Sequence, residues 1–135
     1  MSRQIVGFTA AVMCVGLTML AGCSLIGEGR ERGCDGQEKT ALLQGADELA
    51  RRVPGVVLTG YVGCDSGDSA YVEWTHPSFA KLKQEVLALD CTHVPEATSD
   101  QTGGLDCLWA GQLFGVRYSE MSDKTVRGSV DLGFE

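Results

Sequence analysis

Six cysteines are the residues of this chain whose type and spacing point most directly to chemistry. A thiol can pair with a second thiol, hold a metal ion or carry a covalent modification. Cys23 stands apart, because it ends an uncharged apolar run and follows the small residues Ala21 and Gly22. A basic start (Arg3), an apolar stretch and small residues before a cut site are the parts of a secretory signal. The sequence therefore predicts export.

Leu20-Ala21-Gly22-Cys23 resembles the lipobox of bacterial lipoproteins. In that family the cysteine thiol receives a diacylglyceryl group and the peptide bond before it is cut. The resemblance implies a removed signal peptide over residues 1–22 and a mature chain that begins at Cys23. Two acyl chains suffice for stable anchoring, since each buried methylene contributes about 0.8 kcal/mol. We therefore expect a protein held by its lipid (palmitate or a similar acyl chain) on the extracytoplasmic face of the cell membrane.

An uncleaved transmembrane helix is the alternative for the same segment. Ile5 to Ile26 is 22 residues, which as a helix would span about 33 Å and cross a bilayer. The small pair Ala21-Gly22 directly before a cysteine favours cleavage. Either arrangement leaves the rest of the chain outside the cytoplasm.

The charge balance excludes one class of partner. Without Arg3 the chain holds ten basic and eighteen acidic residues, and nucleic-acid binding needs clustered Lys and Arg. We expect no nucleic-acid partner, an extracellular protein as the candidate partner, and no cofactor. The sequence leaves the oligomeric state open.

Four cysteines remain for the exported domain: Cys34, Cys64, Cys91 and Cys107. They allow three pairings in an oxidising compartment. Cys34–Cys64 and Cys91–Cys107 are favoured, because each closes a local loop between neighbouring elements. A zinc site is the alternative, but the chain has no Cys-x-x-Cys spacing. We expect two disulfides and no metal.

The first half of the domain predicts a helix and a hairpin. Residues 23–33 are glycine-rich and mixed in charge, and form a flexible tether. Asp35 and Glu38 fit a capping box. Apolar residues then recur on one helical face, at Leu42, Ala46, Leu49 and Val53. After Pro54-Gly55, strands are predicted over 56–62 and 70–75, joined by the turn-rich residues 63–69.

The second half predicts a helix and three strands. His76-Pro77-Ser78 opens the helix, with proline at its start, and its apolar face is Phe79, Leu82, Val86 and Leu89. Residues 92–104 predict a long polar loop, and strands follow at 107–110, 113–120 and 126–134. The order α-β-β-α-β-β-β predicts an α+β domain over 34–135, with two helices on one face of a mostly antiparallel sheet of about five strands.

Two internal patterns could carry chemistry. Gly67-Asp68-Ser69 matches the Gly-Asp-Ser of serine hydrolases, with His76 or His93 as the base. The serine lies in a predicted hairpin loop instead of a strand-to-helix elbow, so a turn is favoured. Asp65, Asp68 and Glu73 could gather around calcium, but they lack the EF-hand spacing.

The exported region also resembles small, largely uncharacterised actinobacterial lipoproteins. The shared features are Cys34 before a helix, Val53-Pro54-Gly55-Val56 before a strand, Gly63-Cys64-Asp65-Ser66-Gly67, and a helix followed by a cysteine-bracketed loop. The resemblance implies a compact disulfide-bonded α+β domain on the cell surface. It supplies no activity and no catalytic residues.

The sequence thus predicts a lipid-anchored extracytoplasmic binding domain that is not an enzyme. The polar loop over residues 92–104 is the expected contact surface, because pairing of Cys91 with Cys107 would restrain both its ends. A small protease or hydrolase inhibitor is the alternative, since a rigid loop suits that role. A hydrolase using Ser69 comes third.

Overall fold

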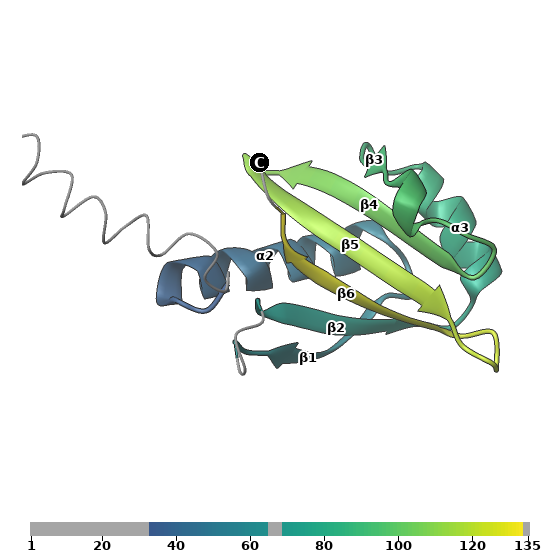
Figure 1. The fold of residues 1–135 in the computed structure, drawn as a ribbon, viewed down its shortest axis with the longest axis horizontal. Coiled ribbons are helices and arrows are strands. Elements are labelled where there is room, and N and C mark those ends of the chain that lie inside the picture. The colour runs from purple at the N-terminus through teal and green to yellow at the C-terminus, as the bar shows by residue number, and fades with distance from the viewer. Residues whose placement is uncertain (1–32, 65–68, 134–135) are drawn as a thin grey trace, which may run out of the picture. The chain divides into compact units, whose positions relative to one another are not determined.

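The computed structural model describes residues 33–64 and 69–133 (Figure 1). They form an α+β domain, as predicted, with two α-helices and one antiparallel sheet. The sheet has six strands instead of about five. The elements are α2 (Gly36–Arg52), β1 (Val57–Val62), β2 (Tyr71–His76), α3 (Phe79–Leu87), β3 (Thr92–His93), the 3₁₀ turn η2 (Pro95–Ala97), β4 (Thr102–Trp109), β5 (Gln112–Glu120) and β6 (Val126–Leu132).

The last strand lies inside the sheet. The spatial order is β1-β2-β6-β5-β4-β3, and every neighbouring pair is antiparallel. β6 therefore separates β2 from β5, although α3, β3 and β4 lie between those two strands in the chain (Figure 1). The sheet is complete only when residues 126–131 pair with residues 71–76, fifty or more positions earlier.

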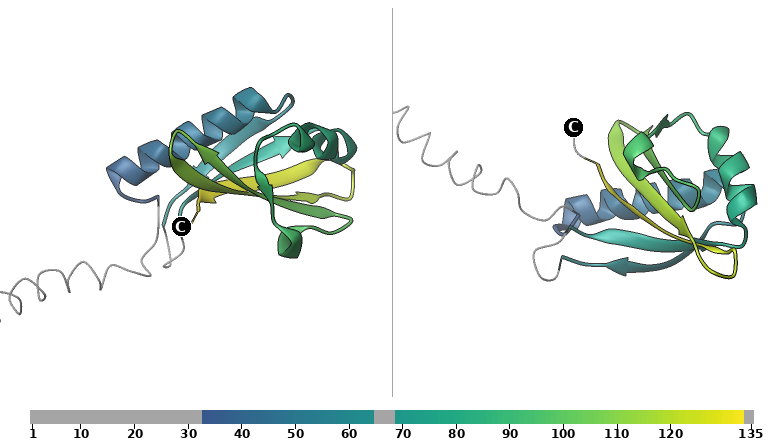
Figure 2. Two further views of the ribbon diagram at one scale, coloured as in Figure 1. Left: turned by 90° about the horizontal axis from the view of Figure 1, so that it is seen from above. Right: turned by 45° about the vertical axis from the view of Figure 1, so that its right-hand side comes forward.

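Both helices bury their apolar faces against the same side of the sheet. The predicted α2 face is confirmed, since Leu42, Ala46, Leu49 and Val53 are all buried. The α3 residues Phe79, Leu82 and Val86 join the same core cluster. α2 lies along one side of the sheet in the left view of Figure 2. The domain is therefore a two-layer structure with one covered and one open sheet face.

Local signals fix the ends of α2. The Asp35 carboxylate accepts a hydrogen bond from the Glu38 amide at 2.8 Å, which confirms Asp35 as the N-cap. In the last turn Arg52 Nε lies 2.6 Å from a Glu48 oxygen, and basic groups there complement the helix dipole. Gly55 follows with a φ of 92°, a left-handed conformation that glycine adopts without strain.

α3 begins two residues later than Pro77 at the first helical position would require. Ser78 is the N-cap, and its hydroxyl accepts from the Lys81 amide at 3.2 Å. Pro77 precedes the cap instead of occupying the first turn. His76 assists, because its Nδ1 accepts from the Ser78 amide at 3.0 Å.

Three aromatic rings in the core each lie over a glycine. A Cβ at Gly45 of α2 would be 2.2 Å from Phe114, one at Gly103 would be 2.1 Å from Tyr118, and one at Gly128 would be 2.3 Å from Trp74. No real Cβ approaches so closely. The absence of side chains at these glycines therefore sets how close α2 and the strands approach the rings.

The additional strand revises the prediction of a loop over residues 92–104. Thr92 and His93 pair with Asp106 and Leu105, and β4 begins at Thr102. The irregular connection is therefore limited to residues 94–101, interrupted by η2. Gly103 and Gly104 read as loop residues in the sequence, but in the sheet they make room for neighbouring side chains.

The fit of Phe114 against α2 predicts opposite outcomes for two substitutions in one helix. Gly45→Ala should lower the free energy of unfolding by about 1–3 kcal/mol, the usual cost of overpacking, although alanine is the better helix former. Gly36→Ala in the first turn should leave stability unchanged or slightly higher, because nothing lies within 4 Å of a Cβ there. Urea unfolding followed by circular dichroism measures both. Equal stability of the two variants would contradict the proposed close contact.

Candidate binding surface on the open face of the sheet

The sheet face that no helix covers is polar. Strand alternation turns Val72, Trp74, Phe114, Val116 and Val130 toward the helices. The side chains between them point the other way, and the register aligns them across strands. One row joins Glu73, Ser129 and Arg117, and a second joins Thr75, Arg127, Ser119 and Thr102.

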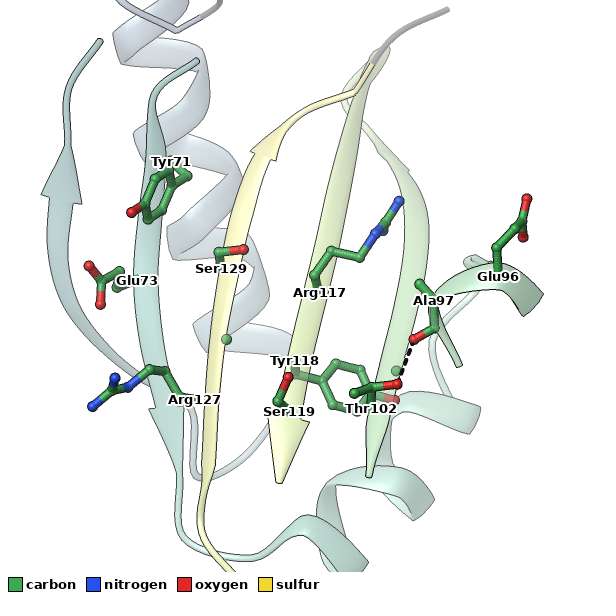
Figure 3. Close-up of a pocket in the computed structure, with 12 residues that line it drawn as sticks. Tyr71, Glu73, Glu96, Ala97, Thr102, Arg117, Tyr118, Ser119, Arg127 and Ser129 are labelled. Carbon is green, nitrogen blue, oxygen red and sulfur yellow. Dashed lines mark hydrogen bonds between the residues drawn. The ribbon is translucent and has the colours of Figure 1, made fainter. Parts of the chain in front are cut away.

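A groove of about 720 Å³ lies on this face (Figure 3). Tyr71, Glu73 and Arg127 line it on the side of β2 and β6. Arg117, Thr102 and the η2 residues Glu96 and Ala97 line it on the side of β4. Small hydroxyl side chains lie between these two walls, at Ser119 and Ser129. The groove thus offers aromatic rings, both signs of charge and several hydroxyl groups.

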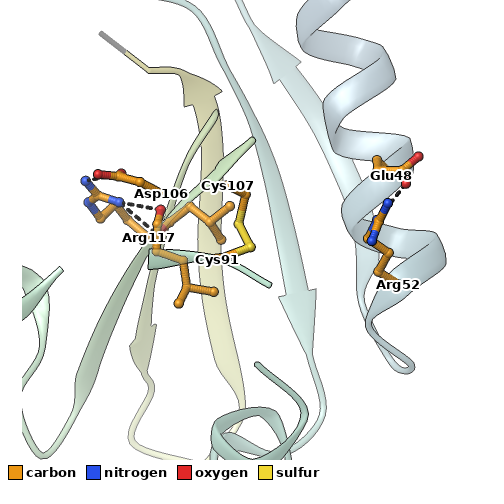
Figure 4. Close-up of a disulfide and its surroundings, with 8 residues drawn as sticks. Glu48, Arg52, Cys91, Asp106, Cys107 and Arg117 are labelled. Atoms are coloured by element: carbon orange, nitrogen blue, oxygen red, sulfur yellow. Dashed lines mark hydrogen bonds and ion pairs between the residues drawn. A yellow bond between two sulfur atoms is a disulfide. The ribbon is translucent and has the colours of Figure 1, made fainter. Parts of the chain in front are cut away.

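Arg117 is fixed by the sheet itself. Its Nη1 donates to the carbonyl oxygens of Leu105 at 2.9 Å and Val116 at 3.0 Å, and its Nη2 lies 3.4 Å from Asp106 Oδ1 (Figure 4). About two-fifths of each side chain of the Arg117–Asp106 pair is exposed. Solvent screens such a pair strongly, so its role is to orient the guanidinium.

Asp131 lies beside this arginine in the middle of the sheet. A Cβ at residue 115 would be only 2.5 Å from its Oδ1, so Gly115 makes the space for the carboxylate. Burial raises the pKa of Asp131. The positive charge of Arg117 lowers this pKa and the negative charge of Asp106 raises it, but burial dominates.

The predicted contact loop forms one wall of the groove. A Cβ on residue 104 would lie only 2.6 Å from the Ala97 Cβ. Glycine at this position therefore allows η2 to pack onto the open face. The Thr98 hydroxyl donates to the Val94 carbonyl at 2.8 Å, and the Thr102 hydroxyl donates to the Ala97 carbonyl at 3.0 Å. Residues 94–102 are thus preorganised by their own hydrogen bonds.

Two cysteine pairs lie at disulfide distance, and they are the pairs that the sequence favoured. Cys34 and Cys64 have Cα atoms 5.8 Å apart and join the start of α2 to the end of β1. Cys91 and Cys107 have Cα atoms 4.5 Å apart (Figure 4). Because Thr92 pairs with Asp106, this second pair lies directly opposite across β3 and β4 and holds one end of the loop.

The structure does not bring the candidate hydrolase residues together. Ser69 precedes β2 and His76 ends it, so seven extended residues separate them by about 23 Å. His93 shares a register row with Val72, four strands away, or about 19 Å. Neither histidine lies within reach of the serine.

His76 has a structural role instead. Its side chain is 2% exposed. Because Nδ1 accepts the Ser78 amide, the proton of the neutral ring is on Nε2, which lies 2.9 Å from the Pro54 carbonyl oxygen and 3.3 Å from Glu85 Oε2. The ring thereby joins the end of α2 to the start of α3.

The calcium and lipid candidates fall largely outside the described residues. Asp65 and Asp68 are not among them, nor is Cys23, while Glu73 lines the groove. Within residues 33–64 and 69–133, no group of three or more His, Cys, Asp or Glu side chains is placed to hold a metal ion. No helix in these same ranges is long and apolar enough to cross a membrane.

The two tryptophans belong to the core. Trp74 is fully buried and Trp109 nearly so, with the Arg52 guanidinium 5.6 Å from the Trp109 ring centre. The groove residues on β2, β5 and β6 were not predicted as a contact surface. Polar residues alternate along β6 and could have indicated an open face, but the row that they form depends on β6 lying between β2 and β5.

Comparison with known proteins gives no relative for this chain. No protein-family model, curated protein or solved structure matches it.

The raised pKa of Asp131 predicts the sign of a pH effect. A carboxyl whose folded pKa exceeds its unfolded value stabilises the fold most when protonated, and this contribution is lost as pH rises through the folded pKa. Asp131→Asn mimics the protonated form. It should unfold at a higher temperature than the wild type at pH 7, and the difference should vanish near pH 3. Thermal unfolding across this pH range measures it.

Asp123→Asn is the matched control with the opposite sign. Hydrogen bonds from the Thr125 hydroxyl and amide lower the pKa of Asp123. Its contribution is present above the unfolded pKa and is lost as pH falls through the folded value. The Asp123 variant should therefore be less stable than wild type at pH 7. A destabilised Asp131 variant at pH 7 would contradict the assigned burial effect.

Proposed function

We propose that this protein is a lipid-anchored extracytoplasmic binding domain, attached to the membrane through diacylglyceryl-Cys23, and that it acts without catalysis. The groove on the open sheet face is its binding surface. The observation that carries the proposal is that four strands (β2, β4, β5 and β6) and η2 place polar side chains of both charges around one groove, while both helices pack on the other face. Small-molecule or peptide groups bind where a few polar atoms converge on a concave surface.

Preorganisation of the groove supports recognition. The Arg117 guanidinium is oriented by two backbone carbonyls, and the wall at η2 is held by side-chain hydrogen bonds. A partner therefore does not have to order these groups on binding, which lowers the entropic cost of association. The wide separation of Ser69 from both histidines favours a binding role over hydrolysis.

The anchor is tested with Cys23→Ala. The variant should incorporate no clickable palmitate analogue and should leave the membrane fraction or accumulate as a precursor, because no thiol remains to be acylated. A Cys14→Ala variant is the control, since Cys14 lies in the predicted signal segment, and it should be labelled like the wild type. Wild-type protein without label would exclude the lipoprotein proposal.

The groove is tested by filling it. Ser129→Trp places a large side chain on its floor and should abolish capture of the partner by photo-crosslinking on intact cells. Ser122→Trp in the exposed turn before β6 is the control and should capture the partner as the wild type does. If both variants retain the partner, the binding surface lies elsewhere.

Inhibition of a protease or hydrolase is the second candidate. The internal hydrogen bonds of residues 94–102 favour it, because a loop that is ordered beforehand binds at lower entropic cost. An inhibitor would contact its target through the exposed loop tip. Capture would then survive Ser129→Trp and be lost with Asp100→Lys.

A further inference from the structure

The outer side of β1 has no backbone partner among the described residues. β1 pairs with β2 on one side only, and no other backbone hydrogen bond involves residues 57–62. Figure 1 and the right view of Figure 2 both show β1 as the outermost strand. A row of unpaired N–H and C=O groups of this kind is a template for another strand.

This edge lacks charge and proline, two of the usual protections against pairing. No charged residue occurs between Arg52 and Asp65, although one residue in five of the whole chain is charged. Proline is absent from β1, and the Val57 side chain is 58% exposed. The Lys39 ammonium lies 4.6 Å from the centre of the Tyr61 ring, on the helix-covered side.

We propose that the β1 edge binds a second copy of this chain, with the two β1 strands antiparallel about a two-fold axis. The two sheets would then form one continuous sheet, and the two open faces would lie on the same side of it. A two-fold contact needs only one self-complementary surface. β1 supplies this surface, because an antiparallel strand pair can be made from one strand and its own copy.

The charge distribution favours a second copy as the occupant. The chain carries a formal charge of −7, so two copies repel each other through most of their surfaces. An uncharged edge is the part where they can approach with little repulsion. The opposite sheet edge, β3, is two residues long and offers too short a template.

β1 contains a bulge, because Leu58 pairs with Trp74 and Gly60 with Glu73, which leaves Thr59 as an extra residue. A bulge increases the local twist of a strand. Because the two copies are identical, both strands at the junction carry the same bulge and the same local twist.

The test uses the full-length protein in detergent, with its mass measured by light scattering and amide hydrogen exchange measured at two protein concentrations. The wild type should have the mass of a dimer, and the amides of residues 57–62 should exchange more slowly at the higher concentration. Val57→Lys should raise the dissociation constant by at least about tenfold, because a lysine on an edge strand opposes pairing and adds like charge to both copies at the junction. The exposure of Val57 means that this variant should retain the wild-type unfolding temperature.

Leu108→Lys is the matched control. Leu108 is also an exposed aliphatic strand residue, 65% exposed, but it lies on β4 and not on the β1 edge. This variant should dimerise like the wild type. A monomeric wild type, equal dimerisation of both lysine variants, or a foreign peptide bound to β1 in place of the second copy would each overturn the proposal.

A Cys23→Ala form separates this proposal from the lipid anchor. The proposed contact is made by residues 57–62 alone, so the unlipidated protein should still be a dimer. Loss of the dimer in this form would show that association depends on the lipid and would overturn the role of β1. Absence of lipid on a dimeric wild type would instead contradict only the anchor.

Discussion

The contact between aromatic rings and glycines fixes the spacing of the two layers. Phe114 lies against the backbone of α2 at Gly45, and Trp74 lies over Gly128 in the neighbouring strand. A glycine inside a helix costs about 1 kcal/mol relative to alanine. The close packing of the ring offsets this cost, because a fully buried aromatic side chain contributes more than 1.5 kcal/mol.

The same packing leaves one unsatisfied group. Among the described residues, Trp74 Nε1 is the buried side-chain nitrogen or oxygen without a hydrogen-bond partner. An unpaired buried donor costs about 1–3 kcal/mol. Trp74 keeps its place because its ring fills the space between β2 and β6 and contacts Tyr118, with ring centres 6.1 Å apart. Shape complementarity in the covered layer therefore outweighs one missing hydrogen bond.

Most of the covered layer could be predicted from the sequence, and the open face could not. Leu42, Ala46 and Leu49 recur at helical spacing, which needs no partner to interpret. The two-residue strand β3 was missed because so short a segment has no periodicity. Gly103 and Gly104 were assigned to a loop because glycine is typical of turns. In the structure Gly103 makes room for the Tyr118 ring and Gly104 makes room for Ala97, contacts that the local sequence does not reveal.

The binding groove was beyond sequence reasoning for a topological reason. Glu73 and Arg117 line the same groove because β6 lies between β2 and β5, and no local signal in residues 126–132 specifies that β2 is the second neighbour. The loop over residues 92–104 was expected to be the contact surface by itself. In the structure it contributes one wall of a surface that is shared with β2, β5 and β6.

The Cys91–Cys107 pair has a consequence for how sheets of this protein could grow. It holds β3 against β4, so one border of the sheet ends in a two-residue strand that is covalently fastened. A third molecule therefore has no long strand to extend there. Edge-to-edge pairing of sheets therefore cannot propagate into a fibre. The molecule can expose an uncharged strand on one border without the risk of open-ended polymerisation.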